Sequence, residues 1–433
     1  MKTVGLITEY NPFHNGHKYH IEEARRITGA DYVIAVMSGN FVQRGTPAMI
    51  DKYSRTTMAL RNGVDIVLEL PVCYATGSAE YFAHGAVALL DRLGVVDALC
   101  FGSEAGNISL LSKAADLLLS TPDAFEDRLQ EQLKEGLSYP AARVRALEHA
   151  LVKDGFSDAA ILTDILSRPN NILGIEYLKA MKKLSSSLEP VTIQRILAQY
   201  HDPVLSSTSK LQMLEPNHSV ISSATALRNA IFSTAETSGA TLNDAFASVP
   251  SDVAEFLLDH LHKTYPITEE DFAPIIKYKL LEEDDISLTE YQDITPDLAR
   301  RLKNYRGYPG SITAFIKEVK TRNMTLTRIN RALIHLLLNI KKEDLSMLET
   351  HGYVPYARVL GIRKESSRLL KQIESSGRIP VITKVTRAKQ QLDEVGLKLL
   401  SNDIFATHLY NQAVYDKYGT ILENEYQHGI LIL

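Results

Sequence analysis

The stretch that decides the fold is Glu9-Tyr10-Asn11-Pro12-Phe13-His14-Asn15-Gly16-His17, between an apolar run and a helical pattern. The apolar run, Val4–Ile7, has the character of a buried strand, and Lys18–Ile27 repeats apolar residues at helical spacing. The motif therefore lies on the turn from a first strand to a first helix. In α/β sheets this turn binds nucleotides, because the helix N-terminus presents free N–H groups to phosphate.

The two histidines of this turn suit a polyphosphate ligand. A triphosphate attacked at its α-phosphorus gathers negative charge on its equatorial oxygens and on the leaving pyrophosphate, which imidazole and helix N–H groups stabilise. Gly16 lets the backbone approach a ligand closely, and His17 falls in the first helical turn, where the dipole favours anions. The plainer interpretation is two surface histidines on a loop. His20, about one turn further on, also has a plainer interpretation as a helix residue that packs nearby.

The first hundred residues alternate between two patterns. Strands are expected at Thr3–Ile7, Asp31–Met37, Asp65–Leu70 and Ala98–Phe101, and helices at Gly16–Thr28, Met49–Asn62 and Ala79–Leu93. Continuous apolar strands separated by helices predict a parallel sheet covered on both faces, which is an α/β, Rossmann-like fold.

The remainder of the chain is mainly helical in pattern. Helix dominates Ile108–Leu184, a strand is expected at Val191–Ile196, and the small-residue stretch Ser233–Leu242 marks a boundary. We therefore expect a catalytic domain over residues 1–235 and a mainly helical domain over residues 236–433. The second is expected to hold a short strand at Ile379–Val385 and a helical hairpin from Thr386 to Tyr418.

Length and composition exclude several classes of protein. The 433 residues are enough for two or three domains of ~100–200 residues each. No apolar stretch approaches the ~18 residues of a membrane span, and the N-terminus lacks the apolar core of a signal peptide. The two cysteines, Cys73 and Cys100, are expected to be buried free thiols. These features predict a cytoplasmic protein.

Charge is distributed unevenly along the second half of the chain. The formal net charge is −5, but acids dominate Ile267–Asp297 and bases dominate the segment that follows. The bases there are Arg300, Arg301, Lys303, Arg306, Lys317, Lys320, Arg322, Arg328 and Arg331, against Glu318. This switch predicts a basic face for a polyanion such as RNA. A solvated helix surface with ordinary ion pairs explains it equally well.

Two motifs resemble the signatures of the HIGH-type nucleotidyltransferase superfamily. His14-Asn15-Gly16-His17 matches the first signature, and Ser222–Arg228 resembles the second, the Ile-Ser-Ser-Thr-x-x-Arg loop that closes on the phosphates. Aligned on Arg228, Ser223 and Thr225 match, whereas Ala224 stands where the family often has its second serine. Phe101-Gly102-Ser103-Glu104 fits the family's adenine and ribose edge, although a plain turn also explains Gly102.

Four ordered motifs narrow the resemblance to the bacterial tRNA(Met) cytidine acetate ligase family. They are Asn11–His17, Met37–Gly45, Phe101–Glu104 and Pro169–Tyr177. The resemblance implies that acetate attacks ATP to give acetyl-adenylate, which then acetylates the N4 amine of the wobble cytidine of elongator tRNA(Met). It implies ATP as cofactor, with Mg²⁺ bound mainly through phosphate oxygens and water, and no metal site built from protein ligands.

The resemblance also assigns residues to the site. His14 and His17 are expected to be catalytic, and Arg195 and Arg228 to contact the triphosphate through their forked donors. The full set expected to bind ATP is Ile7, Thr8, Glu9, Tyr10, Asn11, Pro12, Phe13, His14, Asn15, Gly16, His17, His20, Gly102, Asn170, Asn171, Arg195, Ser222, Ser223 and Arg228.

Several of these residues have plainer interpretations that stay open. Asn170 or Asn171 hydrogen-bonds the nucleotide or caps the helix that follows, and Arg195 is equally explained as a surface arginine on a strand. The loop Ser38–Pro47 is expected to overhang the same crevice and to bind the carboxylate or the RNA, unless it is a mobile turn. Asp51 and Arg55, spaced i,i+4, are expected to pair.

No other catalytic motif is visible. The chain lacks a P-loop, a dinucleotide glycine fingerprint, a Gly-x-Ser-x-Gly elbow and a zinc-ligand cluster. Two other functions remain open. One is an adenylyltransferase acting on a small phosphorylated metabolite, although such enzymes are usually shorter. The other is a non-catalytic RNA-binding protein that retains an ATP site.

Overall fold

A parallel sheet forms the centre of the protein. The computed structural model describes residues 1–120, 123–137, 142, 145–146, 164–195, 223–233, 245–322 and 324–433. Five strands run in the order β5-β2-β1-β6-β7, and every neighbouring pair among them is parallel. Their bounds are β1 (Thr3–Thr8), β2 (Tyr32–Ser38), β5 (Ile66–Leu70), β6 (Ala98–Ser103) and β7 (Glu189–Gln194). The predicted α/β fold is confirmed.

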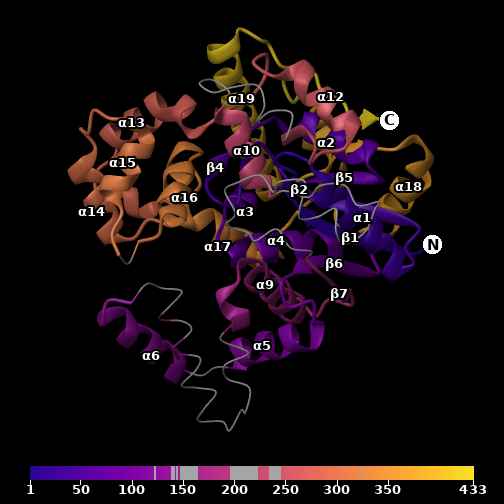
Figure 1. The fold of residues 1–433 in the computed structure, drawn as a ribbon, viewed down its shortest axis with the longest axis horizontal. Helices are drawn as coiled ribbons and strands as arrows, with labels where there is room; N and C mark the ends of the chain where they lie inside the picture. Colours follow the sequence, from indigo (N-terminus) through magenta and orange to yellow (C-terminus); the bar gives the residue numbers. More distant parts are fainter. Residues whose placement is uncertain are drawn as a thin grey trace.

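Helices cover both faces of this sheet (Figure 1). The connecting helices are α1 (Asn15–Thr28), α2 (Lys52–Arg61), α4 (Ala79–Arg92) and α9 (Pro169–Lys183). Side chains alternate along β2, so Val33 and Ala35 join one apolar core with α1 and α2, whereas Ile34 and Val36 join the other with α4 and α9. Strands that are apolar on both faces are what such a two-layer covering requires.

The chain changes direction across the sheet at β1. β1 pairs with β2 on one side and with β6 on the other, so the connections wind in opposite directions from this point. Open α/β sheets bind ligands outside the carboxyl ends of the strands at such a switch point. The end of β1 is where the histidine turn begins.

Strands from the last part of the chain extend the same sheet. β8 (Ala357–Ile362) runs antiparallel to β5, and β10 (Leu431–Ile432) and β9 (Val381–Ile382) pair with β8. The sheet therefore draws on both sides of the boundary expected near residue 235, and the division of the chain there stays a prediction. The expected strand at Ile379–Val385 is confirmed only as the two residues of β9.

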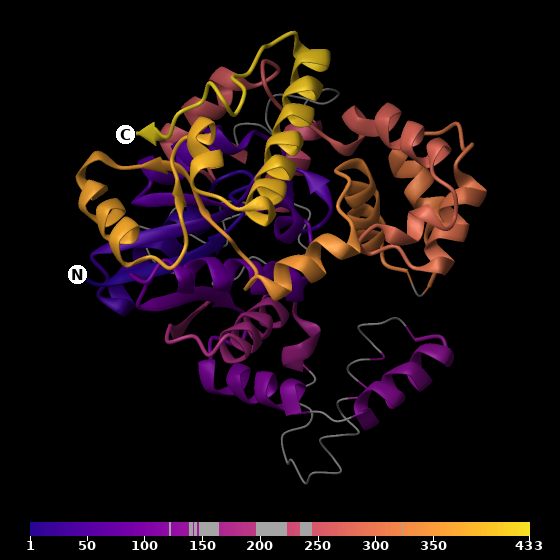
Figure 2. The same ribbon diagram turned by 180° about the vertical axis from the view of Figure 1, so that it is seen from behind.

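The expected helical hairpin near the C-terminus is wrong. A short 3-10 helix, η4 (Val385–Gln390), is followed by one uninterrupted helix, α19 (Glu394–Tyr418), shown in yellow in Figure 2. Asp393 caps α19 by accepting from the backbone N–H of Gly396 at 2.8 Å, and Gly419 ends the helix at a φ of 70°. Beyond Gly396 in the first turn, no glycine or proline interrupts the sequence between these two signals.

Four helices pack against one another beside the sheet and are hereafter called the helical cluster. They are α13 (Ala273–Glu282), α14 (Pro296–Tyr305), α15 (Ile312–Val319) and α16 (Leu326–Leu337). Thr295, Ser311 and Thr325 each cap a helix of the cluster through a side-chain oxygen. In Figure 1 the cluster lies to one side of the sheet, with α16 between its outer helices and β4 (Thr46–Pro47).

The other described elements complete the arrangement. They are β3 (Phe41–Val42), β4 (Thr46–Pro47), α3 (Val72–Ala75), α5 (Ile108–Ser120), α6 (Asp123–Lys134), α10 (Ala224–Ser233), α12 (Ser251–His260), η1 (Glu269–Phe272), η2 (Ser287–Glu290), α17 (Lys342–Thr350), η3 (Lys364–Ser366) and α18 (Ser367–Ser376). Both cysteines are free and buried, as expected. Within the described ranges, no helix has the length and apolar character needed to cross a bilayer.

Candidate functional site

The two histidines of the turn stack on each other at the start of α1. His14 is the N-cap residue and His17 lies in the first turn, and their ring centroids are 3.6 Å apart with planes inclined by 20°. The backbone N–H of His14 donates to Nδ1 of His17 at 3.2 Å. Because Nδ1 of His17 accepts, a neutral ring carries its proton on Nε2, which is left as a hydrogen-bond donor.

Both imidazoles are neutral at ordinary pH. Burial, together with the nearby charges of Arg195 and Arg228, lowers the pKa of His14 to about 3. Burial and the neighbouring His14 hold the pKa of His17 well below its usual value. The histidines therefore act as uncharged donors, and the positive charge at this end of the sheet belongs to the two arginines.

The turn itself is rigidly packed. The ring of Tyr10 meets His17 edge-on at 4.9 Å, and Phe13 packs against the same imidazole at 5.6 Å. Tyr10 and Phe13 are themselves buried. Nδ1 of His14 is buried and makes no hydrogen bond to any part of the chain that the structure describes. A buried polar atom without a partner at a helix N-terminus is a position for a ligand to fill.

Arg55 holds the carboxyl ends of two strands together. Its buried guanidinium donates to the carbonyl oxygens of Glu9 at 2.7 Å and Ser38 at 2.9 Å, and also to that of Gly39. The expected Asp51–Arg55 pair is therefore wrong. Asp51 instead caps α2 by accepting from the backbone N–H groups of Tyr53 and Ser54 in the first turn of that helix. The guanidinium of Arg55 instead satisfies backbone carbonyl groups at the ends of the two strands.

The second signature lies against the first. Arg228, on α10, donates to the carbonyl oxygen of Asn11 at 2.7 Å across 217 positions of sequence, and to Oγ1 of Thr225 at 3.1 Å. Ser223 accepts from the N–H of Ala226 at 3.1 Å and so begins α10. The expected contribution of Ser222 lies outside the described residues. The structure thus brings Arg228 to the histidine turn, as the resemblance implied.

A third group gathers at the end of β6. A β-carbon on Gly102 would stand 3.3 Å from Cγ of Arg195, and Nη1 of Arg195 donates to Oδ1 of Asn170 at 3.4 Å. The charge of Arg195 is near enough to lower the pKa of His14, His17 and His20. Gly102, Asn170 and Arg195 therefore lie together beside the histidines, and their contact with a nucleotide stays a prediction.

The two asparagines of α9 have different surroundings. The carboxylate of Glu104 accepts from the backbone N–H of Asn170 at 3.2 Å and of Asn171 at 2.8 Å, so Glu104 satisfies the start of α9 and the interpretation of an asparagine as its cap is wrong. Asn171 is buried, and its Oδ1 accepts from the N–H of Ala105 at 3.0 Å. Asn170 is half-buried beside Arg195 and is the better placed of the two for a ligand.

The remaining turn residues mainly support the site. Asn11 accepts from the N–H of Met49 at 2.8 Å. The backbone N–H of Asn15 donates to the carbonyl oxygen of Ser248 at 2.9 Å. His20 faces β6, with its Nε2 at 3.9 Å from Sγ of Cys100, and burial lowers its pKa to about 4. His20 thus packs beside β6, and its contact with a nucleotide stays a prediction.

The loop after β2 reaches the histidine turn. It forms the small β3–β4 hairpin, and the backbone N–H of Gln43 donates to Oε1 of Glu9 at 2.9 Å. The expectation that this loop overhangs the same edge of the sheet is confirmed. Binding of a carboxylate or of RNA by the loop stays a prediction.

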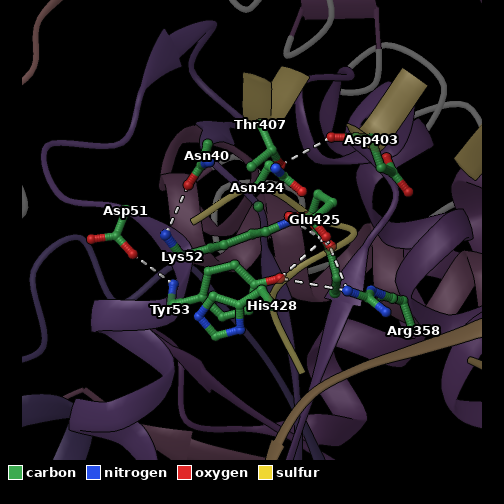
Figure 3. Close-up of polar contacts among 12 residues, drawn as sticks. Asn40, Asp51, Lys52, Tyr53, Arg358, Asp403, Thr407, Asn424, Glu425 and His428 are labelled. Carbon is green, nitrogen blue, oxygen red and sulfur yellow. Dashed lines mark hydrogen bonds and ion pairs between the residues drawn. The ribbon is translucent and has the colours of Figure 1, made fainter. Parts of the chain in front are cut away.

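A buried ionic cluster that the sequence did not suggest lies behind this loop (Figure 3). Nζ of Lys52 is 2.7 Å from carboxylate oxygens of both Glu69 and Glu425, and Nη2 of Arg358 is 2.9 Å from Glu425. Each of these side chains is at most 5% exposed. The backbone N–H of Lys52 also donates to Oδ1 of Asn40 at 2.8 Å. The cluster therefore ties the loop after β2 to the C-terminal part of the chain.

Seven of the nine basic residues in the segment 300–331 fall into two groups, and Arg306 and Arg328 belong to neither. Arg300, Lys303 and Arg331 form ion pairs with Asp297, Asp285 and Asp293, and Arg301 donates to carbonyl groups at the end of α15. Lys317, Lys320 and Arg322 are exposed, and their side chains make no ion pair or hydrogen bond with the described part of the chain. These three residues are hereafter the exposed basic triad. Local pairing thus accounts for part of the charge switch, and a basic surface remains.

Comparison with known proteins identifies the family. The model of the HIGH Nucleotidyl Transferase family matches residues 1–425. A tRNA(Met) cytidine acetate ligase of Acetivibrio thermocellus is 38% identical over 412 residues, covering 95% of this chain and 94% of the relative. The chain belongs to the tRNA(Met) cytidine acetate ligase family.

Further relatives agree with this assignment. The tRNA(Met) cytidine acetate ligase of Caldanaerobacter subterraneus subsp. tengcongensis is 40% identical over 418 residues, covering 95% of this chain and 96% of the relative. Two crystal structures of Thermotoga maritima TmcAL cover the whole of both chains. The apo form is 32% identical with a TM-score of 0.89, and the form bound with alpha-thio ATP is 31% identical with a TM-score of 0.87.

Proposed function

We propose that this protein is an ATP-dependent ligase that acetylates the wobble cytidine of elongator tRNA(Met) through an acetyl-adenylate. The observation that carries the proposal is the meeting of the two signatures. Arg228 donates to the carbonyl of Asn11 within the His14–His17 turn, at the switch point of the sheet. Full-length similarity to the ligase family supports the same reaction.

In the first step, a carboxylate oxygen of acetate attacks the α-phosphorus of ATP and pyrophosphate leaves. The Nε2–H of His17 and the backbone N–H of Gly16 at the start of α1 donate to the phosphate oxygens on which charge develops. Arg195 and Arg228 supply the positive charge that the neutral imidazoles lack.

In the second step, the N4 amine of the cytidine attacks the acetyl carbonyl and AMP leaves with the electron pair of the broken C–O bond. The amine nitrogen loses a proton, and the products are N4-acetylcytidine and AMP. The same donors that stabilise the first transition state hold the departing phosphate. The adenine is expected along Gly102 and Asn170, and the triphosphate along His17 and Arg228.

Mg²⁺ is proposed as the companion of the triphosphate. The described residues contain no group of three or more histidine, cysteine, aspartate or glutamate side chains arranged to hold a metal ion. The donor set of the turn consists of N–H groups and guanidinium groups, which bind anions. The ion would therefore be held through phosphate oxygens and water, where it would neutralise charge on the leaving pyrophosphate.

The proposal is tested by incubating the protein with ATP, radiolabelled acetate and bulk tRNA. We expect label in tRNA, release of AMP and pyrophosphate, and acetate-dependent exchange of pyrophosphate into ATP without tRNA. A stable nucleotide-containing product would instead indicate an adenylyltransferase. Absence of both label and exchange would indicate an RNA-binding protein that only retains an ATP site.

A further inference from the structure

We propose that α16 couples the helical cluster to the catalytic edge of the sheet, and that His335 and Gly45 are positioning residues for acetyl transfer to RNA. The inference rests on the proposed two-step reaction and adds how its second step is aligned. The first step joins two small molecules at the histidine turn. The second needs a cytidine delivered by a large RNA, so the surface that holds the RNA must be fixed relative to that turn.

His335 spans two parts of the molecule. It lies on α16 and is fully buried. Its Nδ1 is 3.0 Å from the carbonyl oxygen of Gln292, which belongs to the segment leading into α14, and its Nε2 is 3.1 Å from the carbonyl oxygen of Thr76, just beyond α3. Carbonyl oxygens only accept. The imidazole of His335 therefore lies between the carbonyl oxygen of Gln292 in the segment leading into α14 and that of Thr76 beside α3. His335 and Thr76 are 259 positions apart in sequence.

The contact at Thr76 continues to the histidine turn. The carbonyl of the next residue, Gly77, accepts from Nε2 of Gln43 at 3.5 Å, and the backbone N–H of Gln43 donates to Glu9 at 2.9 Å. Glu9 directly follows β1, and its carbonyl is held by Arg55. These contacts connect α16 at His335 to the histidine turn, so they set the position of the helical cluster relative to that turn.

Gly45 provides a second and independent contact with α16. It lies at the tip of the β3–β4 hairpin with a φ of 73°, and a β-carbon there would stand 2.5 Å from Cα of Arg331 and closer still to its nitrogen. The obstacle is helix backbone, which cannot rotate away as a side chain does. Only glycine allows the hairpin to touch α16, and the same hairpin carries Gln43.

The exposed basic triad links this coupling to RNA binding. Lys317 lies on α15, and Lys320 and Arg322 follow it on the way into α16. RNA held by these side chains is therefore positioned by the same helices that contact Gly45 and Thr76. A misplacement of about 1 Å between a bound reactant and its catalytic groups costs up to ~100-fold in rate, so a small shift of α16 is sufficient to impair transfer.

The test of His335 uses two substitutions that distinguish the roles of its two ring nitrogens. His335→Asn keeps an N–H donor near the position of Nδ1 and loses the reach to Thr76, whereas His335→Gln keeps a donor near the position of Nε2. We expect His335→Asn to lower kcat for tRNA acetylation ~10–100-fold and to leave acetate-dependent pyrophosphate exchange within about 2-fold. His335→Gln should retain most of the transfer rate. A purely structural role would impair both half-reactions, and in both variants alike.

The glycine test has a matched control in the same chain. Gly45→Ala meets the helix, whereas Gly419→Ala meets nothing within 4 Å at nearly the same φ, 70°. Both substitutions carry the same backbone strain, so only Gly45→Ala should lower tRNA acetylation while sparing pyrophosphate exchange. Combining it with His335→Asn should cost less than the product of the two separate losses, because both act through α16.

The outcomes distinguish this inference from the proposed function. Equal losses in both half-reactions, no loss in either, or equal behaviour of the two histidine variants would overturn the coupling while leaving the ligase activity established by the wild-type protein. Failure of the wild-type protein in both half-reactions would instead overturn the proposed function.

Discussion

Removing the negative charge of Glu425 should destabilise the folded protein strongly. Glu425 is 2% exposed and contacts Lys52 at 2.7 Å and Arg358 at 2.9 Å, while Tyr53 donates to it at 3.1 Å. Glu425→Gln keeps the size of the side chain but leaves the two buried cations sharing only Glu69 as an anion. Removing one partner of a buried ion pair costs about 3–5 kcal/mol.

We expect a loss near the lower limit, about 3 kcal/mol, because Lys52 keeps both oxygens of Glu69, at 2.7 and 2.8 Å. For a domain of ordinary size this lowers Tm by roughly 6–12 °C at pH 7. The assay is thermal unfolding followed by circular dichroism. The control is Glu423→Gln, which removes the same charge from an exposed side chain two residues away and should shift Tm by no more than about 2 °C.

The Tm difference between wild type and Glu425→Gln should depend on pH through the ionisation of Glu425. Burial raises the pKa of Glu425, but the charges of Lys52 and Arg358 outweigh burial and hold it well below its ordinary value. A carboxylate with a lowered pKa stabilises the folded state above its unfolded pKa, and the contribution is lost as the pH falls through the folded value. The Tm difference between wild type and Glu425→Gln should therefore be full at neutral pH and shrink below about pH 4.5. A difference under about 2 °C at pH 7, or one unchanged in acid, would refute the reasoning.

Three further predictions concern the proposed reaction. His17→Ala should lower acetate-dependent pyrophosphate exchange at least ~100-fold in a protein that still folds, as expected for loss of a transition-state donor, and near-normal exchange would contradict its role. Gly102→Ala should raise KM for ATP in the same assay with little change in kcat, because the new β-carbon occupies the surface under Arg195; an unchanged KM would place the nucleotide elsewhere. Charge reversal of the exposed basic triad should weaken tRNA binding and reduce its salt slope by roughly one for each phosphate that is no longer neutralised, with exchange intact. If Lys371→Glu on α18 weakens tRNA binding and charge reversal of the triad does not, the RNA docks on the surface that carries α18.

The catalytic half of the fold was largely predictable from its sequence because its signals are local. Each of the first four parallel strands is mainly apolar, with Glu69 in β5 as the one charged residue among them, and the helices between the strands repeat their apolar residues at helical spacing. β8 was missed because Arg358 interrupts its apolar run. That arginine is buried only because Glu425, 67 positions later, neutralises it. No local pattern reports a partner at that distance.

The functional site was likewise predictable only where its signal is local. The histidine turn is a contiguous motif, so its placement at a strand–helix junction followed from the sequence. Arg55, Glu104 and Lys52 support it through contacts with carbonyl groups, helix ends and carboxylates elsewhere in the fold. In a linear sequence each of these reads as an ordinary charged residue. Their burial, which a single sequence does not reveal, is what distinguishes them.

The position of Glu425 in the chain also sets the order of events during synthesis. Its carboxylate is made 372 residues after Tyr53, which at ~5–20 residues per second is a delay of roughly 20 to 75 s on the ribosome. Until then Lys52 lacks one of the two carboxylates that neutralise it. The catalytic turn emerges early, yet the loop beside it becomes fully anchored only when the message is nearly read. A chain released before that point therefore lacks the carboxylate that pairs with Lys52 and Arg358, and we expect it to be less stable and more readily degraded than the finished protein.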